Sequence, residues 1–468
     1  MIDVLWGLIL QDNGACACKS RGFGMRPTER TKTPQNDLFR LKLSNLIDLR
    51  HELCRLGERI NWQALVDEFG ALYAEHGRPG VPIRLMAGLH YLKHAFGLSD
   101  EAVVKGWVEN PYWQYFCGEE YFQHRLPIDP SQMTRFRSRL GPSGCEKLLE
   151  LTITAGLATR AVKPASFREV TVDTTVQEKA IAFPTDGRLY HKGRVWLVRL
   201  AKHSGIELRQ SYVRKGKQAL FMQQRYAAAR QMRRARRELK RSKVYLGRVY
   251  RDILRKLPQQ SAAVQERFAE PLARVARLLA QQRHDHNKLY SLHAPEVECI
   301  AKGKAHKKYE FGVKVSLAVT QRDNFIVGAL ALPGNPFDGH TLPAALRQVE
   351  RLTGTPPERC FVDRGYRGHG ITDISVHIAG QKRGLTRALR RALKRRNAIE
   401  PVIGHTKHDG LMGRNYLNGS AGDAMNAILA AAGHNLRIIL RKLRLSWRHF
   451  LFQLLHDLRV TAPGNVTP

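Results

Sequence analysis

Three acidic residues have the types and positions that could do chemistry in this sequence. Asp173 lies in a strand pattern at residues 168–176, on the face opposite to Val170 and Val172. Asp363 directly follows the apolar strand pattern at 359–362, and Glu400 lies in a helical pattern at 385–406. Carboxylates brought together bind divalent cations, and a pair of such ions promotes in-line displacement at phosphorus.

Each aspartate taken alone is more simply a turn or cap residue, so the metal hypothesis depends on the third acid. Arg396 precedes Glu400 by about one helical turn, and Lys407 follows it by about two. Cations on one face with Glu400 favour its ionised form and can also contact phosphate. The alternative is a surface ion pair of little consequence. Pro401 predicts a kink directly after the acid.

The segment at 25–165 reads as helical. Apolar residues at helical spacing predict a helix over 84–92, and residues 97–100 end it and cap the next one at 101–107. Ser131 is the expected N-cap of a short helix that carries Arg135, Arg137 and Arg139. A helix, a tight turn and a basic helix would suit a DNA groove, whereas the alternative is a helical bundle with a solvated basic face.

The elements around the acids predict a mixed α/β fold. Thr185 or Asp186 should cap a helix over 187–200. Alternating strands at 311–319 and 325–332 predict a hairpin. Helices follow at 342–352, 385–406 and 423–443. Acids at the ends of two strands are typical of a site on an open α/β sheet.

Charge points to a polyanionic partner. The 468-residue chain has 77 Lys and Arg against 41 Asp and Glu, a formal net charge of +36. Residues 201–304 read as long helices, and residues 212–256 hold 16 Lys or Arg with two acids, Glu238 and Asp252. So few acids leave most of these cations without internal partners, which favours phosphate contact over a merely solvated face. The densest stretch holds Arg233, Arg234, Arg236 and Arg237.

Several classes of protein are disfavoured. The seven cysteines are scattered and form no C-x-x-C pair, which argues against a disulfide framework or zinc module and for a reducing cytoplasm. His405, His408 and Asp409 have no standard zinc spacing and read as a polar helix end. No apolar run reaches membrane-spanning length, and there is no G-x-x-x-x-G-K-[ST] loop for a nucleotide. Residues 1–24 read as a disordered or mis-called extension.

The ordered set of motifs resembles the bacterial insertion-sequence DDE transposases. Arg396, Glu400 and Lys407 match the family's Tyr-x2-Arg-x3-Glu-x6-Lys signature, with Leu393 at the tyrosine position. The blocks around Asp173 and Asp363 look like those that carry the family's two aspartates. Segments 333–340, 399–405 and 414–423 resemble the insertion-sequence-5 family in particular. The resemblance covers roughly residues 38–443.

The resemblance implies an RNase H-like mixed sheet flanked by helices. The implied domains are an N-terminal helical DNA-binding domain at 25–165, a catalytic domain at 166–200 and 305–445, a basic helical insertion at 201–304 and a C-terminal tail at 446–468. Asp173, Asp363 and Glu400 would bind two Mg²⁺ ions, with Mn²⁺ as a substitute. The expected DNA contacts are Arg396, Lys407, Arg364, Arg135, Arg137, Arg139, Arg233, Arg234, Arg236 and Arg237.

The implied reaction is metal-dependent cleavage at the element's ends, followed by attack of the freed 3′ hydroxyl on target DNA. Partners would be the element's inverted repeats and the target site, bound by a homodimer associated with the nucleoid, without a membrane or a nucleotide cofactor. Two alternatives remain: a metal-dependent nuclease that lacks strand transfer, and an inactive DNA-binding descendant.

Overall fold

A six-stranded mixed sheet forms the centre of the computed structural model, which describes residues 41–73, 80–282, 284–301, 308–381 and 384–460, without the side chains of 445–460. The expected extension at 1–24 lies outside these residues. The strand order is β2-β3-β1-β5-β6, and β4 also pairs with β3. The strands are β1 (Glu169–Glu178), β2 (Glu298–Ala301), β3 (Tyr309–Thr320), β4 (Ile326–Leu332), β5 (Arg359–Val362) and β6 (Ser375–Ile378).

Two kinds of pairing meet at β1, which lies inside the sheet. β3 runs antiparallel to β1 and forms the expected hairpin with β4, whereas β5 runs parallel to β1. The parallel pair requires a crossover, and α12 (Asp338–Thr353) supplies it by packing on β3 and β4. The mixed α/β class predicted from the sequence is therefore confirmed.

Short helices build the N-terminal part, as expected. They are α1 (Leu43–Leu46), α2 (Glu52–Arg59), α3 (Trp62–Gly70), α4 (Ile83–Phe96), α5 (Asp100–Glu109), α6 (Pro111–Phe116) and α7 (Ser131–Ala158). Gly97 ends α4 in the left-handed region at φ 66°, and the Ser99 side chain caps α5. The predicted N-cap at Ser131 is wrong: Ser131 is the first helical residue, and its N–H donates to Asp129. α7 breaks at Gly141, where φ is 62° and ψ is −171°.

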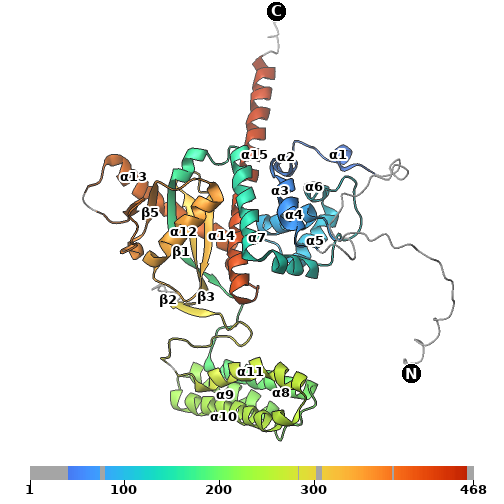
Figure 1. Ribbon diagram of the computed structural model, residues 1–468, viewed down its shortest axis with the longest axis vertical. Coiled ribbons are helices and arrows are strands. Elements are labelled where there is room, and N and C mark those ends of the chain that lie inside the picture. Colours follow the sequence, from blue (N-terminus) through green and yellow to red (C-terminus); the bar gives the residue numbers. More distant parts are fainter. Residues whose placement is uncertain (1–40, 74–79, 283, 302–307, 382–383, 461–468) are drawn as a thin grey trace, which may run out of the picture.

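One continuous hydrophobic core joins the N-terminal helices to the sheet. The long helix α15 (Gly419–Val460) packs on α4, α7 and β4, so it lies between the two parts (Figure 1). At the centre of this contact, Asn435 donates to Ile326 O (2.8 Å) and accepts from Ile326 N (2.9 Å). Because α15 runs to Val460, it continues past the expected start of a tail at residue 446.

A second core belongs to a four-helix unit that projects below the sheet in Figure 1. Its helices are α8 (Asp186–His203), α9 (Val213–Ala228), α10 (Met232–Lys256) and α11 (Ala262–Ala280), with the turn η3 (Leu257–Gln259) before α11. The expected helix at 187–200 is confirmed as α8, capped by Thr185. However, Leu189, Tyr190 and Leu197 of α8 pack in the second core. The insertion therefore begins at α8, and the expected boundary at residue 201 is wrong.

A buried polar cluster ties the insertion's two connections to α15. Lys179, just after β1, is 6% exposed and pairs with Glu296 (2.7 Å) and Asp423 (2.8 Å). Asn415 donates to the same Asp423 carboxylate (2.6 Å). Glu296 lies just before β2, so the chain entering the insertion and the chain leaving it meet at one lysine. Burial of the Lys179 ammonium without these carboxylates would destabilise the fold, so the three groups must stay together. The cluster therefore fixes both connections of the insertion.

The expected helix at 385–406 is broken in the middle. It consists of α13 (Arg387–Arg395), the 3-10 turn η5 (Arg396–Ala398) and α14 (Ile399–His408). The break precedes Glu400, and Pro401 lies in the first turn of α14. Proline has no backbone N–H, but the N–H groups in the first turn of a helix have no partner within the helix, so Pro401 is well tolerated there. The predicted kink after the acid is therefore wrong.

Candidate active site

Asp173 and Asp363 lie at the same level on neighbouring strands. The parallel register pairs Glu169 with Arg359 and Thr171 with Phe361. Continued by two residues, it places Asp173 opposite Asp363, whose backbone is still extended. Neighbouring strands are about 4.8 Å apart, and directly opposed residues of a parallel pair point to the same face. The structure thus brings together the two aspartates that the sequence singled out.

Asp173 contacts the cation of the signature motif. Its Oδ2 lies 3.6 Å from Arg396 Nη1, and its Oδ1 accepts from Thr174 N (2.7 Å). Arg396 is largely buried, with its side chain 11% exposed. Within the described chain, its Nε and Nη1 atoms are buried and have no hydrogen-bond acceptor. Arg396 therefore provides positive charge beside Asp173 and retains donors that a further anion could satisfy.

Asp363 starts a 3-10 turn, η4 (Arg364–Tyr366), by accepting a hydrogen bond from Gly365 N (2.9 Å). Gly365 lies between two carboxylates. A Cβ at this position would be 3.1 Å from Asp363 Oδ1 and 3.2 Å from Asp338 Oδ2. The absence of a side chain at 365 thus allows these two carboxylates to approach the same turn.

Asp338 and Lys314 are site residues that the sequence analysis did not assign. Asp338 begins α12, and its Oδ1 accepts from Lys314 Nζ (3.0 Å) and Thr174 Oγ1 (3.1 Å). Lys314 is only 8% exposed, although it lies in the middle of β3. A lysine inside an otherwise buried strand was the available signal, because a buried ammonium requires an anionic partner.

The Tyr366 hydroxyl is buried among these acids. Burial raises the pKa of Tyr366, and the charges of Asp173, Asp338 and Asp363 raise it further, so the phenol stays protonated. Within the described residues, its Oη has no hydrogen-bond partner. An orphaned buried hydroxyl beside several carboxylates indicates that the site is built for an additional polar group or ion.

Glu400 lies on α14, the helix that packs against β1, the strand of Asp173. Gln321, in the turn after β3, donates to Ala392 O (2.6 Å), and Arg395 donates to Gln321 O (2.7 Å). These bonds fix the end of α13 and thereby Arg396. Ile399 and Val402 are buried, and α14 packs against β1. Glu400 itself is exposed in the first turn of α14, one helical turn after Arg396.

No three His, Cys, Asp or Glu side chains in the described ranges are grouped closely enough to hold a metal ion. The donor set nevertheless fits a hard cation in kind: the carboxylates of Asp173 in the middle of β1, not at its end as expected, and of Asp363 directly after β5, an orphaned hydroxyl and an exposed glutamate nearby. The exposed Glu400 side chain can change rotamer, whereas the two aspartates are set by the sheet. At the other end of α14, His405 pairs with Asp409 (2.8 Å), as expected for a polar helix end.

The basic residues of the N-terminal part have different surroundings. Arg135 and Arg139 are exposed on α7, as a DNA contact requires. Arg137 is 3% exposed and forms a bidentate pair with Asp100, through Nη1 to Oδ1 at 2.9 Å and Nη2 to Oδ2 at 2.5 Å. The expectation that Arg137 contacts DNA is therefore wrong: its guanidinium anchors α7 to α5.

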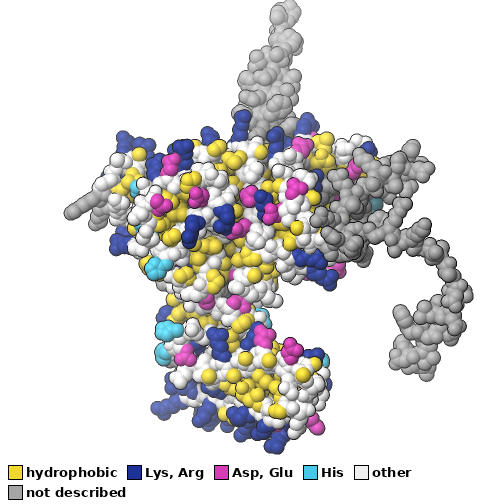
Figure 2. Space-filling view, viewed as in Figure 1, with side chains coloured by type: hydrophobic (Ala, Val, Ile, Leu, Met, Phe, Trp, Pro, Cys, Tyr) yellow, Lys and Arg dark blue, Asp and Glu magenta, His cyan; other side chains and the backbone are white. Residues whose placement is uncertain are grey.

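The arginines of the insertion lie on its outer surface. Arg233, Arg234, Arg236 and Arg237 are all exposed on α10, and Figure 2 shows Lys and Arg gathered along the lower edge of this unit. Arg237 lies 3.9 Å from Glu238. Among the described residues, no carboxylate is within ion-pair distance of the other three arginines, so their field is open to a polyanion.

Arg364 directly follows Asp363, and Lys407 lies about two helical turns after Glu400. Arg364 is exposed and packs against Gly380, whose φ of 85° and lack of a side chain permit the contact. Lys407 is half-buried near the end of α14, and its carbonyl accepts from Gly413 N (3.0 Å). Both positions remain expected phosphate contacts.

Two family models and a relative match parts of this chain. Residues 41–139 match a family described as a transposase domain of the DUF772 type, and residues 282–436 match the transposase DDE domain. An uncharacterised protein, ORF8 in the nfe locus of Rhizobium meliloti, is 55% identical over 207 residues, which are 44% of this chain and 100% of the relative. No solved structure matches.

The DDE match spans β2 to the first part of α15 and contains Asp363 and Glu400. The DUF772 match spans α1 to the first part of α7. The chain belongs to the DDE transposases of insertion sequences, enzymes of the polynucleotidyl transferase and nuclease type that generally use divalent metal ions. Among the described residues, no helix is long and apolar enough to cross a membrane.

Proposed function

We propose that this transposase cuts DNA at the ends of its own element and joins the freed 3′ hydroxyl to target DNA, using Asp173, Asp363 and Glu400. The observation that carries the proposal is the placement of Asp173 opposite Asp363, with Arg396 3.6 Å from Asp173 and Glu400 one helical turn further on. An RNase H-like arrangement of the sheet, of the insertion-sequence-5 type, accounts for this placement.

The three acids would hold two Mg²⁺ ions, or Mn²⁺ in their place. When bound, such ions activate a water or hydroxyl and stabilise the charge that develops on the attacking and leaving oxygens. Carboxylates and water are the ligands that both ions prefer.

The chain's other groups orient and neutralise the substrate. Arg396 can donate from Nε and Nη1 to a phosphate beside Asp173. Tyr366, kept protonated by burial and by the three aspartates, is a neutral hydroxyl donor at the same place. Lys314 holds Asp338 at the start of α12 (3.0 Å), which fixes the turn that carries Asp363. Asp338 is therefore a positioning residue in this proposal.

DNA would be held through several basic surfaces. Arg135 and Arg139 on α7, the four α10 arginines, Arg364 and Lys407 supply phosphate contacts that do not depend on sequence. The element's inverted repeats and the target site are the proposed ligands, and a homodimer would bring two element ends together. The nucleoid is the place where such a protein acts.

The test is an in vitro reaction with the element's end sequences, target plasmid and Mg²⁺. Asp173→Asn, Asp363→Asn and Glu400→Gln should each lower end cleavage by roughly a hundredfold or more while end binding stays intact, because each removes a charged ligand from the reacting centre. Chelation of the metal should stop the wild type in the same way. Asp373→Asn, an exposed aspartate after β5, is the matched control and should react normally.

The products of this reaction separate the remaining possibilities. Joined products support the proposal. Cleavage without joining would instead indicate a metal-dependent nuclease, and binding without cleavage would indicate an inactive descendant. Full strand transfer by any one of the three variants would remove that residue from the catalytic set.

A further inference from the structure

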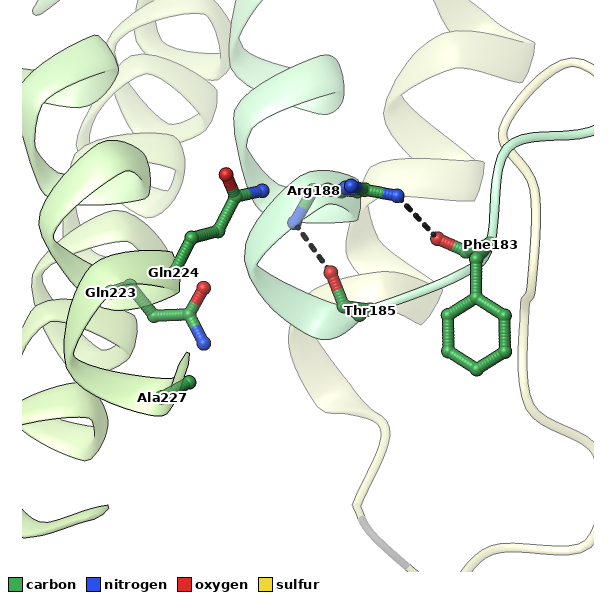
Figure 3. A pocket seen from close by; sticks show the side chains of 6 residues that line it. All are labelled: Phe183, Thr185, Arg188, Gln223, Gln224 and Ala227. Carbon is green, nitrogen blue, oxygen red and sulfur yellow. Dashed lines mark hydrogen bonds between the residues drawn. The ribbon is translucent and has the colours of Figure 1, made fainter. Parts of the chain in front are cut away.

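A hollow of about 500 Å³ lies where the loop after β1 meets the four-helix insertion. Phe183, Thr185 and Arg188 line one side, and Gln223, Gln224 and Ala227 of α9 line the other (Figure 3). The proposed metal site uses none of these residues. We propose that this hollow receives one unstacked nucleobase of a DNA strand, an inference that rests on the proposed function.

Phe183 offers an aromatic face to such a base. Its side chain is 61% exposed. Its ring meets Phe311 of β3 edge to face, with centroids 5.4 Å apart and an interplanar angle of 86°. Phe311 in turn packs against Tyr290 at 5.4 Å. One part of the Phe183 ring is thus held in place while much of it stays in solvent, and a stacked base would cover that surface.

The two glutamines offer hydrogen bonds to the edge of a base. α8 and α9 approach so closely that a Cβ at Gly187 would lie 3.0 Å from Gln223 Oε1. The glycine therefore leaves room for the Gln223 side chain beside α8. A glutamine amide presents a donor and an acceptor together, the combination that can pair with the edge of a base such as adenine.

The charges around the hollow favour a base inside it and phosphates outside it. Asp186 lies in the first turn of α8 and opposes an anion at that helix end. Arg188, whose Nη1 donates to Phe183 O (3.4 Å), lines the hollow. Arg225 is exposed directly after Gln224. Cations at the rim with an acid at the helix end match a base whose backbone runs along the surface.

The hollow is within reach of DNA bound at the acids. Phe183 follows Asp173 by ten residues, and ten residues span at most about 35 Å. Only a short stretch of the DNA strand would therefore lie between the hollow and the acids. The loop that carries Phe183 follows β1, the β-strand that carries Asp173. A base bound in the hollow would therefore determine which phosphate of the DNA strand lies at the acids.

Binding of the full chain to a fluorescein-labelled oligodeoxyadenylate, measured by anisotropy without metal, tests this inference. Stacking on one aromatic side chain is worth about 1–3 kcal/mol, so Phe183→Ala should weaken single-strand binding roughly 5- to 150-fold. Binding to a duplex of the same length should change less than about twofold, and Phe183→Trp should restore single-strand binding. Phe221→Ala is the matched control, because Phe221 is 60% exposed on α9 but does not line the hollow.

Equal single-strand affinities for Phe183→Ala and Phe221→Ala would overturn the inference. Binding of free dAMP as tight as that of the oligonucleotide, and dependent on Phe183, would also overturn it, since the hollow would then be a site for free nucleotides. Duplex binding that persists in either case leaves the proposed function standing. A protein that binds neither form of DNA would contradict both proposals.

Discussion

The position of the Asp363 carboxylate depends on a single neighbouring residue, Gly365. Its N–H donates to Asp363, and two carboxylates lie within 3.2 Å of the point where a Cβ would be. Contacts that short force one of the neighbours to move. The Asp363 carboxylate is therefore held by the hydrogen bond from the Gly365 N–H, and the absence of a Gly365 side chain leaves room for it.

Gly365→Ala should lower end cleavage roughly 3- to 10-fold, because the added Cβ pushes the Asp363 carboxylate aside by a few tenths of an ångström, and a displacement of about 1 Å can cost about 100-fold. End binding and the thermal midpoint should change little. Gly70→Ala, at the end of α3 with no atom within 4 Å of the added Cβ, is the control. Wild-type cleavage by the Gly365 variant would mean that Asp363 does not need its observed position.

At the scale of elements, a buried ion pair holds the basic part of α7. Asp100 of α5 pairs with Arg137 (2.5 Å) and with Lys93 of α4 (2.8 Å). Burial alone would raise the pKa of Asp100, but hydrogen bonds and charges from Arg137 and Lys93 hold it below its usual range. One carboxylate thus fastens α4 and α5 to α7, the helix that presents Arg135 and Arg139.

Asp100→Asn should lower the free energy of unfolding near neutral pH by about 3 kcal/mol, since it leaves two buried cations without their anion. A depressed folded-state pKa contributes stability above the unfolded value of 3.8 and loses it as the pH falls. The difference between wild type and variant should therefore shrink toward about pH 3.

Urea denaturation at the two pH values checks the Asp100 prediction. Glu101→Gln, exposed in the same helical turn, should cost less than about 1 kcal/mol at either pH. An Asp100 effect of that small size, or one independent of pH, would show that the ion pair does not fasten α5 to α7.

Much of this element structure follows from local sequence. The hairpin, the short strand at 359–362, the Thr185 cap and the Gly97 stop all depend on neighbouring residues, and all are confirmed. The parallel contact that places Asp173 opposite Asp363 joins strands far apart in sequence; of the two acids expected at strand ends, Asp363 follows β5 but Asp173 lies inside β1, because β1 continues to Glu178 along β3.

Three features depend on packing between segments far apart in the chain and could not be predicted from the sequence. The apolar face of α8 could cover either core, and only the fold assigns it to the insertion. Arginine spacing on α7 cannot tell that Arg137 faces inward toward Asp100. Asp338 and Lys314 are brought together by the packing of α12 on β3, so the link between them was not visible in sequence.

At the scale of the whole molecule, charge is concentrated on the projecting unit. The formal net charge is +36, and Arg233, Arg234 and Arg236 of α10 are exposed without a carboxylate in ion-pair distance among the described residues. The two acids of this stretch, Glu238 and Asp252, are buried; Glu238 pairs with the exposed Arg237 and Arg241, and Asp252 with the exposed Arg255. The positive electrostatic field of Arg233, Arg234 and Arg236 on the outer face of α10 is therefore available to DNA.

Replacement of Arg233, Arg234, Arg236 and Arg237 by Gln should reduce the slope of log affinity against log salt by about 0.9 for each arginine that contacts phosphate. The control replaces Arg168, Arg351, Arg359 and Arg444, which are exposed but paired with glutamates. Both variants lose the same net charge. Equal slopes for the two variants would mean that the α10 arginines face solvent in the complex.

The central claim is that Asp173, Asp363 and Glu400 hold the metal ions together, and iron-mediated cleavage of the protein tests it most directly. Fe²⁺ bound in place of Mg²⁺ reduces added hydrogen peroxide to hydroxide and hydroxyl radical, ascorbate returns the iron to Fe²⁺, and the radicals cut the chain next to the ion. Cuts beside residues 173, 363 and 400, all suppressed by excess Mg²⁺ and by Asp173→Asn, are the expected result. Cuts beside the two aspartates but none near 400, or cuts confined to another region, would contradict the account.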